Sequence, residues 1–201
     1  MIFTQTPVLE NAWVRLEPLS HDHAEQLAAA VSIGDLWKTW YTSIPAPEAM
    51  TAEIERRLGL QREGRMAPWA IVSRASGRAV GMTTYMNIDD ANRRVEIGST
   101  WLGREAQGAG INPAAKLLVL ARAFDDLDCI AVEFRTHWHN GQSRAAIAKL
   151  GAKQDGLLRN HQLGSNGTLR DTVVFSIINA EWPSVRQGLL ARLAATGKPE
   201  A

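Results

Sequence analysis

The chain has 201 residues, of which 45% are hydrophobic and 21% charged, the composition of a globular protein that can form a hydrophobic core. Lys and Arg number 22 against 21 Asp and Glu, and a net charge of +1 excludes the basic field that holds nucleic acid or an anionic membrane. Cys129 is the only cysteine, so an intramolecular disulfide and a multi-thiolate metal site are excluded.

The first residues, MIFTQTPVLE, have neither the basic nor the apolar segment of a secretory signal. No apolar run approaches the ~20 residues that span a bilayer. We therefore expect a cytoplasmic protein with no membrane or nucleic-acid partner. No linker, repeat or charge block divides the sequence, so we expect a single domain over residues 1–201, with 181–201 as a C-terminal helical appendage.

The first half of the chain is predicted to form strands and two helices. Residues 13–18 alternate apolar and polar side chains, which indicates a strand. One helix follows Ser20, and a second runs from Pro47 to about Gly64. Three further strands, 69–73, 79–87 and 94–102, are joined by short turns and predict an antiparallel meander.

The hydrophobic period changes in the second half. Leu117, Leu120, Ala121 and Phe124 have the spacing of an amphipathic helix, which is predicted over 113–127. The remaining predicted elements are a strand at 130–136, a helix at 143–150, a hairpin of 153–163 with 168–178, and a helix at 181–195. The strand–helix–strand unit requires two parallel strands joined by a right-handed crossover. The sequence therefore predicts an α/β (α+β) fold with a mixed, mostly antiparallel sheet and helices on both faces.

A glycine-rich loop, REAQGAGINP, fills residues 104–113 between a strand and a helix. Gly108 and Gly110 permit backbone angles closed to other residues and let a ligand approach the backbone closely. Asn112 is predicted as the helix N-cap, with Pro113 as the first helical residue. Free N–H groups at the positive end of a helix dipole form an anion site, most naturally for phosphate.

Several kinds of phosphate ligand are compatible with such a loop. A nucleotide-triphosphate loop requires a lysine, which does not follow Gly110. A dinucleotide site requires a third glycine, where Ala114 stands, and its loop belongs after the first strand of a βαβ unit rather than after a meander. A glycine turn that only connects strand to helix remains an alternative.

The order and spacing of several motifs resemble the GNAT superfamily of acyl-CoA-dependent N-acetyltransferases. The motifs are Val95-Glu96-Ile97-Gly98, Trp101-Leu102, the loop 107–112, Asn140-Gly141-Gln142-Ser143 and Lys149-Leu150-Gly151-Ala152. The Glu-Ile-Gly strand followed by Trp-Leu, and the early Val-Arg-Leu-Glu-Pro-Leu, are similar to the RimJ/RimL-like branch, the ribosomal-protein N-acetyltransferase type. The resemblance covers residues from about 8 to 180.

The resemblance implies a site for acetyl-CoA or coenzyme A as cosubstrate, with no metal. The strands at 94–102 and 130–136 are expected to splay apart, so that their unpaired backbone groups bind the pantetheine arm and thioester, with Trp101 and Leu102 acting through the main chain. The pyrophosphate is expected on the amides of Gln107, Gly108, Ala109, Gly110, Ile111 and Asn112. Asn140 matches the residue that contacts the cofactor arm, although it could equally cap the next helix.

The resemblance also suggests two catalytic residues. Glu96 is the candidate general base, because it lies on the strand beside the cleft and burial would raise its pKa toward neutrality. Its alternative role is an ion pair with Arg93 or Arg94. Ser143 could protonate the leaving thiolate, or could act only as a helix N-cap.

Two departures from the family pattern leave the acceptor open. Ser99 stands where related sequences commonly have Tyr, and His137-Trp138-His139 is unusual before Asn140. His137 and His139 could share a metal, but no third ligand is evident, and loop histidines at the mouth of the site are the preferred interpretation. His161 is expected to be a sheet histidine with a satisfied ring.

Two further predictions concern aromatic and thiol side chains. Trp37, Trp40 and Tyr41 belong either to the core or to an apolar lip of the acceptor site. Cys129 is expected to be a small buried residue between a helix and a strand.

Three functions are compatible with these features. The first is an N-acetyltransferase that moves an acetyl group from acetyl-CoA to a primary amine by direct attack. Its acceptor is either a protein N-terminus, as the RimJ/RimL-like branch suggests, or a small amine. The second is a non-catalytic module that binds or senses acyl-CoA, and the third is an enzyme that uses ATP or NAD. The hairpin and the last helix could form a homodimer contact.

Overall fold

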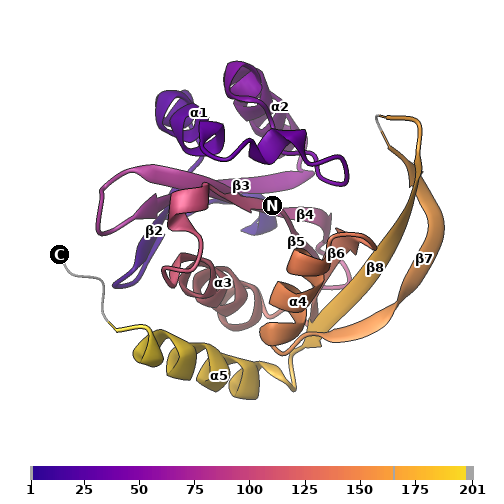
Figure 1. The fold of residues 1–201 in the computed structure, drawn as a ribbon. Coiled ribbons are helices and arrows are strands. Elements are labelled where there is room, and N and C mark those ends of the chain that lie inside the picture. The colour runs from indigo at the N-terminus through magenta and orange to yellow at the C-terminus, as the bar shows by residue number, and fades with distance from the viewer. Residues whose placement is uncertain (1, 165, 198–201) are drawn as a thin grey trace.

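One mixed sheet organises the molecule (Figure 1). The computed structural model describes residues 2–164 and 166–197, so Met1, Ser165 of the predicted hairpin turn and 198–201 of the predicted appendage lie outside the described residues. The strands are β1 (Leu9–Glu10), β2 (Val14–Pro18), β3 (Met66–Ser73), β4 (Ala79–Asp89), β5 (Arg94–Leu102), β6 (Ala131–His137), β7 (Lys153–Leu163) and β8 (Leu169–Ile178). The helices are α1 (Ala24–Ser32), α2 (Met50–Arg62), α3 (Ile111–Ala121), α4 (Gly141–Lys149) and α5 (Trp182–Ala195).

The strand order is β1-β2-β3-β4-β5-β6-β8-β7, and β5 with β6 is the one parallel pair among the described strands. Short turns make β3, β4 and β5 antiparallel, whereas the crossover through α3 lets β6 run parallel to β5. The predicted mixed, mostly antiparallel sheet is confirmed. The predicted order of elements also agrees with the structure, apart from the additional two-residue strand β1.

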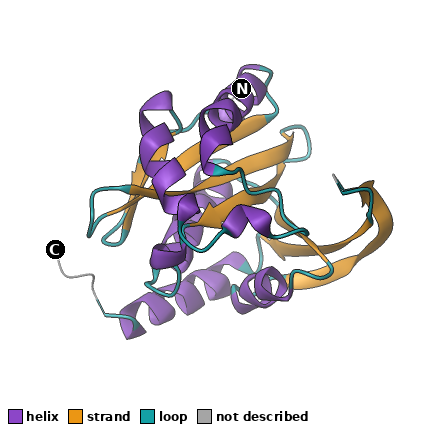
Figure 2. Cartoon of the chain, turned by 45° about the horizontal axis from the view of Figure 1, so that its top comes forward, coloured by secondary structure: helices purple, strands orange, loops and turns teal. Residues whose placement is uncertain are grey.

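The helices form layers on both faces of the sheet, as Figures 1 and 2 show. α1 and α2 cover one face and pack on β4 and β3, whereas α3 and α4 lie on the other face. α5 packs outside α3, where Trp182 stacks on Phe124, and it buries Leu189 and Leu193 in the main core. Within the described residues, none of the helices combines the length and apolar character needed to cross a membrane.

The predicted buried stripe of α3 is confirmed at Leu120 and Phe124 and differs at its other two positions. Leu117 and Ala121 are only partly buried, whereas Lys116 and Val119 are buried. The predicted stripe assumed one buried face, but α3 lies between the sheet and α5 and is covered on two sides. The helix continues as a π-helical turn, Arg122–Asp126.

The start of α3 also corrects a prediction. The helix begins at Ile111, and Gly110, with a φ of +77°, takes the N-cap position. Asn112 and Pro113 therefore lie inside the first turn, and Asn112 is not the N-cap. The reason is local: a left-handed glycine turns the chain into the helix two residues before the Asn-Pro pair.

The strands β5 and β6 remain paired over only three residues each, Arg94–Glu96 with Ala131–Glu133. Beyond this point β5 continues to pair with β4 as far as Leu102, and β6 continues to pair with β8 as far as His137. The two strands thus separate in the middle of the sheet. The resulting opening between β5 and β6 is called the splay below.

Candidate functional site: the splay between β5 and β6

A β-bulge lies on β5 immediately after the splay begins. Met82 of β4 pairs with Trp101 and Thr84 pairs with Gly98, so Ser99 and Thr100 together face the single residue Thr83. Ser99 has a φ of +46°, in the left-handed region that non-glycine residues rarely adopt. The backbone of β5 is therefore turned at the edge of the splay.

The glycine loop before α3 presents unpaired N–H groups. Within the described residues, the amides of Gly108, Ala109, Gly110, Ile111 and Asn112 donate to no acceptor of the protein. This cluster of N–H donors lies at the N-terminus of α3, where such donors form an anion site.

Gln107, however, does not fit the prediction that its amide is free. Its N–H donates to the Arg104 carbonyl at 3.2 Å, because a 3-10 turn, Arg104–Ala106, precedes it. Its side chain donates from Nε2 to the Leu102 carbonyl at 3.1 Å. The Gln107 side chain therefore links the loop to the end of β5 by a hydrogen bond.

The two glycines of the loop have different surroundings. A Cβ added at Gly108, where φ is +83°, would meet no atom within 4 Å. A Cβ at Gly110 would lie 3.4 Å from the Trp13 ring and 3.4 Å from Thr196 Oγ1. Gly108 thus keeps the space above the amides open, as a phosphate site requires, whereas Gly110 permits close packing of the loop on the protein.

Trp101 and Leu102 end β5 and point to opposite faces of the sheet. The Trp101 indole packs in the core beneath α1 and α2, and the Leu102 side chain packs in the core beneath α3. The Leu102 carbonyl accepts the hydrogen bond from Gln107 Nε2. The backbones of Trp101 and Leu102 pair with Met82 and Gly81 of β4.

Asn140 and Ser143 lie at the start of α4. Asn140 is the N-cap, and its Oδ1 accepts a hydrogen bond from the Ser143 N–H at 2.9 Å. Ser143 lies three residues further on, so the interpretation of Ser143 as N-cap is wrong and that role belongs to Asn140. The Ser143 hydroxyl is half-buried and is not required for the cap.

Glu96 lies at the last paired position before the splay and is 5% exposed. Its Oε2 accepts a hydrogen bond from Asn87 Nδ2 at 2.7 Å and lies 3.5 Å from Arg135 Nε. The alternative ion pair with Arg93 or Arg94 is absent among the described contacts, since Arg94 pairs with Glu133 at 2.6 Å and Arg93 with Asp128.

Burial raises the pKa of Glu96 above its ordinary value, and the nearby charge of Glu133 acts in the same direction. The Asn87 hydrogen bond and the charges of Arg135 and Arg170 oppose the shift without cancelling it. Glu96 is thus a desolvated carboxylate at the splay, which is the environment that suits a general base.

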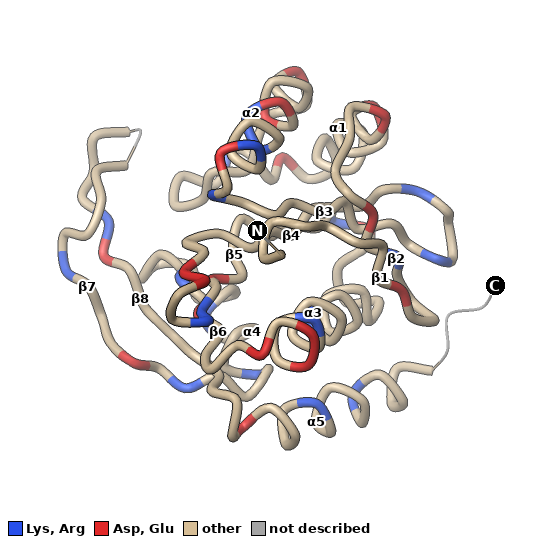
Figure 3. Tube along the Cα trace, turned by 180° about the vertical axis from the view of Figure 1, so that it is seen from behind, with Lys and Arg blue, Asp and Glu red and all other residues tan. Residues whose placement is uncertain are grey.

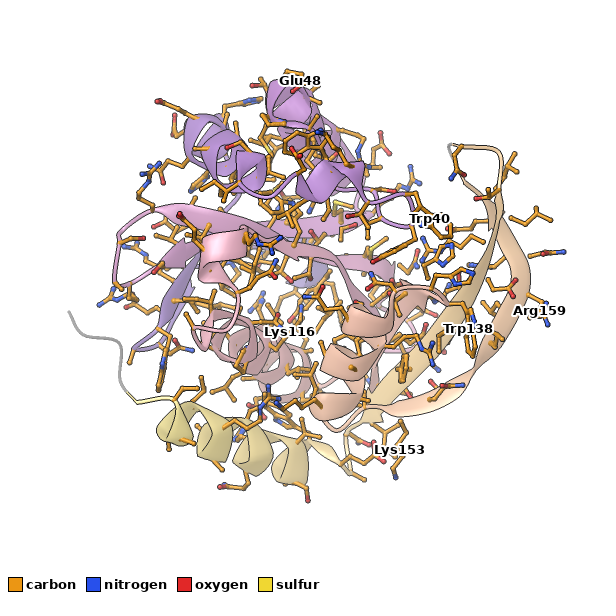
Figure 4. All side chains as sticks on the ribbon, in the orientation of Figure 1. Trp40, Glu48, Lys116, Trp138, Lys153 and Arg159 are labelled. Carbon is orange, nitrogen blue, oxygen red and sulfur yellow. The ribbon has the colours of Figure 1, made fainter. Side chains whose placement is uncertain are left out.

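An aromatic cluster lies where β6 ends. It consists of Trp40, Tyr41, His137 and His139, and neighbouring ring centroids lie 5.2 to 6.1 Å apart. Trp40 is 55% exposed, whereas His137 is buried and accepts a hydrogen bond from the His139 N–H at Nδ1. Figure 4 shows Trp40 on the side of the molecule from which the β7–β8 hairpin projects.

The remaining candidate residues from the sequence are His161, Cys129 and Trp37. Among the described residues no group of three or more His, Cys, Asp and Glu side chains is arranged to hold a metal, and His161 pairs with Thr172 Oγ1 at 3.1 Å. Cys129 is buried, as predicted, and burial raises the pKa of its thiol to about 11. Trp37 is partly buried against the core beneath α1 and α2, so Trp37 and Trp40 have different environments.

The comparisons with known proteins agree with this geometry. Residues 14–153 match the acetyltransferase (GNAT) domain family. A crystal structure of a GCN5-related N-acetyltransferase from Brucella melitensis superimposes with a TM-score of 0.86 and 31% identity, covering 99% of this chain and 93% of that one. RimJ of Mycobacterium smegmatis in complex with CoA-disulfide has a TM-score of 0.74 and 26% identity, covering 96% and 94% of the two chains.

A Bacillus subtilis protein named as a ribosomal N-acetyltransferase, YdaF, is 34% identical over 106 residues. That match covers 53% of this chain and 57% of the Bacillus protein. The fold, the splay and the loop have the arrangement of a GNAT acetyltransferase domain. The chain belongs to the GNAT acetyltransferase domain family, and the predicted resemblance to it is confirmed.

Proposed function

We propose that the protein is an N-acetyltransferase that moves an acetyl group from acetyl-CoA to a primary amine by direct attack. The observation that carries the proposal is the splay, which has the loop of unpaired amides at one end and the buried carboxylate of Glu96 beside it. An anion site and a desolvated base on the same gap meet the requirements of a thioester donor and an amine acceptor.

Acetyl-CoA is the proposed cosubstrate, and the amides of residues 108–112 are proposed to bind its pyrophosphate. The backbone of Trp101 and Leu102 would contact the pantetheine arm along the open edge of β5. Asn140 would contact the arm from the other side of the splay. Among the described residues its side-chain Nδ2 has no hydrogen-bond partner, since Oδ1 caps α4 and the backbone N–H donates to the His137 carbonyl.

The reaction needs a neutral amine. The nitrogen attacks the thioester carbonyl carbon, a C–N bond forms, the C–S bond breaks, and the thiolate of CoA leaves. Glu96 accepts the proton that the amine loses, and the half-buried Ser143 hydroxyl is proposed to donate one to the thiolate. The raised pKa of Glu96 makes it a stronger base than a surface glutamate.

The proposed acceptor is the N-terminus of a protein. The names of YdaF and RimJ support this class, since the first is that of a ribosomal N-acetyltransferase and the second belongs to the branch that the sequence resembles. The exposed Trp40 beside His137 offers an apolar surface at the mouth of the splay. A small amine is the alternative acceptor, and acyl-CoA sensing without turnover is the alternative function.

Three further proposals accompany this function. Residues 1–201 are proposed to act as one domain, the protein is proposed to be cytoplasmic, and a homodimer contact is proposed for the hairpin and α5.

The test measures thiol release from acetyl-CoA together with the mass of the acceptor. A panel of peptides with free N-termini is compared with the same peptides blocked at the N-terminus, and with small primary amines. We expect thiol release and a 42-Da mass increase only with free amines. Binding of acetyl-CoA without turnover on the whole panel would favour the sensing module instead.

A further inference from the structure

The bulge of β5 is held from both faces of the sheet by buried side chains of Arg and Lys. Consecutive residues of a strand point to opposite faces, so Thr83 faces α3 and Thr84 faces α2. Arg57 of α2 reaches Thr84, and Lys116 of α3 reaches Thr83. Ser99 and Thr100, the bulged residues, lie between these contacts.

Arg57 is 1% exposed. Its Nη1 donates to Thr84 Oγ1 at 2.8 Å and to the Ser99 carbonyl at 3.2 Å. Its Nε donates to Glu53 Oε1 at 2.7 Å, which supplies the opposite charge. The guanidinium thus binds the backbone of the one bulge residue whose φ is positive.

Lys116 is 6% exposed and lies between α3 and the sheet, as Figure 4 shows. Its Nζ donates to Thr100 Oγ1 at 2.9 Å and to Thr83 Oγ1 at 3.3 Å, and the two hydroxyls lie 2.8 Å apart. Within the described residues no carboxylate forms an ion pair with it. Burial lowers the pKa of this amine to about 7.

We propose that Arg57 and Lys116 are positioning residues for acetyl transfer, which fix the β5 bulge so that its backbone polarises the thioester carbonyl in the splay. This inference rests on the proposed function. Neither side chain touches the splay in the contacts described, so each acts through Ser99 or Thr100.

A buried guanidinium and a buried lysine amine are costly groups with which to hold a strand. Burying a charged or strongly polar group costs several kcal/mol unless it is fully paired, and apolar residues of the same volume pack at lower cost. Both side chains contact residues of the bulge, Arg57 at Ser99 and Lys116 at Thr100. The guanidinium of Arg57 also supplies a fixed positive charge on this part of β5, which favours the negative charge that a carbonyl oxygen gains in the transition state.

The experiment compares Arg57→Met and Lys116→Met with the matched controls Arg62→Met and Lys149→Met. Arg62 lies on the same helix as Arg57 but is exposed, and Lys149 is an exposed lysine at the end of α4. Three quantities are measured: kcat with a peptide acceptor, the Kd of acetyl-CoA, and the infrared C=O stretch of bound acetyl-CoA labelled with ¹³C at the carbonyl.

We expect kcat to fall about 10- to 100-fold in the two test variants, the loss typical of a small misplacement of reacting groups. The Kd of acetyl-CoA should stay unchanged, and the C=O stretch should move toward its value in free acetyl-CoA. The two controls should keep the wild-type kcat and frequency. Wild-type kcat and frequency in both test variants would overturn the inference.

Replacing a buried Arg or Lys could also unfold the protein. A second set of variants therefore changes only the threonine hydroxyls that these side chains contact. Thr84→Val and Thr100→Val retain side-chain volume and keep Arg57 and Lys116 in place. The first removes the hydrogen bond of Arg57 to Thr84, and the second removes that of Lys116 to Thr100. They should lower kcat in the same direction, and Thr84→Ser and Thr100→Ser should restore it. Wild-type kcat in both valine variants would contradict the inference.

Failure of the proposed function gives a different result. If the wild-type protein binds acetyl-CoA but turns over no acceptor, the acetyltransferase proposal fails. The inference about the bulge is then decided by the carbonyl frequency alone. If the wild-type protein binds no acetyl-CoA, both fail.

Discussion

The two faces of the sheet at β5 are built in different ways. On the α3 face, the proposed phosphate site comes from one short loop and the helix after it. On the α2 face, the proposed acceptor side combines Glu96 of β5, Asn87 of β4, Arg135 and His137 of β6, and Trp40 from the segment between α1 and α2. A site made from one loop is specified by a short stretch of sequence. A site made from several elements forms only when the fold brings their residues together.

The charged side chains also differ between surface and interior. Acidic and basic residues both occur along α2 (Figure 3), and Arg56 and Arg62 of this helix form ion pairs with Glu53 and Glu55. At β5, by contrast, Glu96, Arg57 and Lys116 are buried, and each has specific partners. These three titratable side chains lie in the interior, where most side chains are apolar.

Glu96→Gln is the sharpest test of the acceptor face. We expect kcat to fall about 10²- to 10³-fold, because the amine loses its proton acceptor, while the Kd of acetyl-CoA stays unchanged. In the wild type, kcat/KM should fall as pH drops through the raised pKa of Glu96, since the base must be deprotonated.

Glu133→Gln is the matched control, because Glu133 ends the same paired segment but binds Arg94 and Arg135. It should change kcat much less than Glu96→Gln. Wild-type turnover of the Glu96→Gln enzyme across the pH range would eliminate Glu96 as the base.

Lys116→Met tests the α3 face through stability. The pKa of Lys116 is about 7 in the folded protein and close to 10.5 in the unfolded chain. Below pH 7 both states bind the proton and the penalty of burying the charge is complete. Between pH 7 and 10.5 only the unfolded chain keeps it, so the free energy of unfolding should rise by up to about 1.4 kcal/mol per pH unit from this group.

Urea unfolding of the wild type and of Lys116→Met from pH 7.0 to 8.5 measures this contribution. The variant should lack the rise. Using the difference between the two proteins removes the effect of every other titrating group. Parallel curves for wild type and variant would show that Lys116 does not titrate in this range.

Gly108→Ala separates binding of the phosphate from backbone strain. A left-handed alanine costs about 1 kcal/mol, and the added methyl would occupy the space above the free amides. We expect the Kd of acetyl-CoA to rise about tenfold, equivalent to ~1.4 kcal/mol.

Gly77→Ala in the β3–β4 turn is its control, since Gly77 has a φ of +65° and a Cβ there would also meet no atom within 4 Å. Both variants should lose similar stability in thermal unfolding. Equal Kd values in the two variants would argue against the loop as the phosphate site.

Trp40→Ala is expected to have the smallest effect. Loss of the exposed indole beside His137 should raise the acceptor KM about threefold to tenfold, on the scale of one aromatic contact, and leave the acetyl-CoA KM unchanged. Ile33→Ala, another exposed apolar residue of the same connecting segment, is the control. A rise in the KM of acetyl-CoA would indicate that Trp40 contacts the cofactor instead of the acceptor.

The sequence predicted the fold well where the pattern is local. Alternating strands joined by short turns define the meander, and the change of period near Pro113 indicates the crossover helix that makes β5 and β6 parallel. Gly108 and Gly110 mark the loop because few residues adopt their backbone angles. The start of α3 was misplaced, since Asn112 with Pro113 gives a strong N-cap signal while Gly110 ends the loop earlier.

The acceptor side, and the contacts of Arg57 and Lys116 with the bulge, could not be predicted from local sequence patterns. Arg57 and Lys116 have the spacing of ordinary polar helix residues, and their burial depends on how α2 and α3 lie on the sheet. The positive φ of Ser99 follows from the register of β4 with β5, which no local motif carries. Asn87 and Arg135 gave no signal as partners of Glu96, because they come from different strands.

The free edge of the sheet has a consequence for self-association. β7 is the last strand, projects with β8 beyond the body of the molecule, and carries exposed Lys153 and Arg159 (Figure 4). Its pairing with β8 shifts register at 154–156 and again at 158–162, where Asn160 has a φ of +47°. Charged and irregular outer strands resist the stacking of further chains that leads to fibrils. Copies of this protein should therefore meet through side chains rather than extend one continuous sheet.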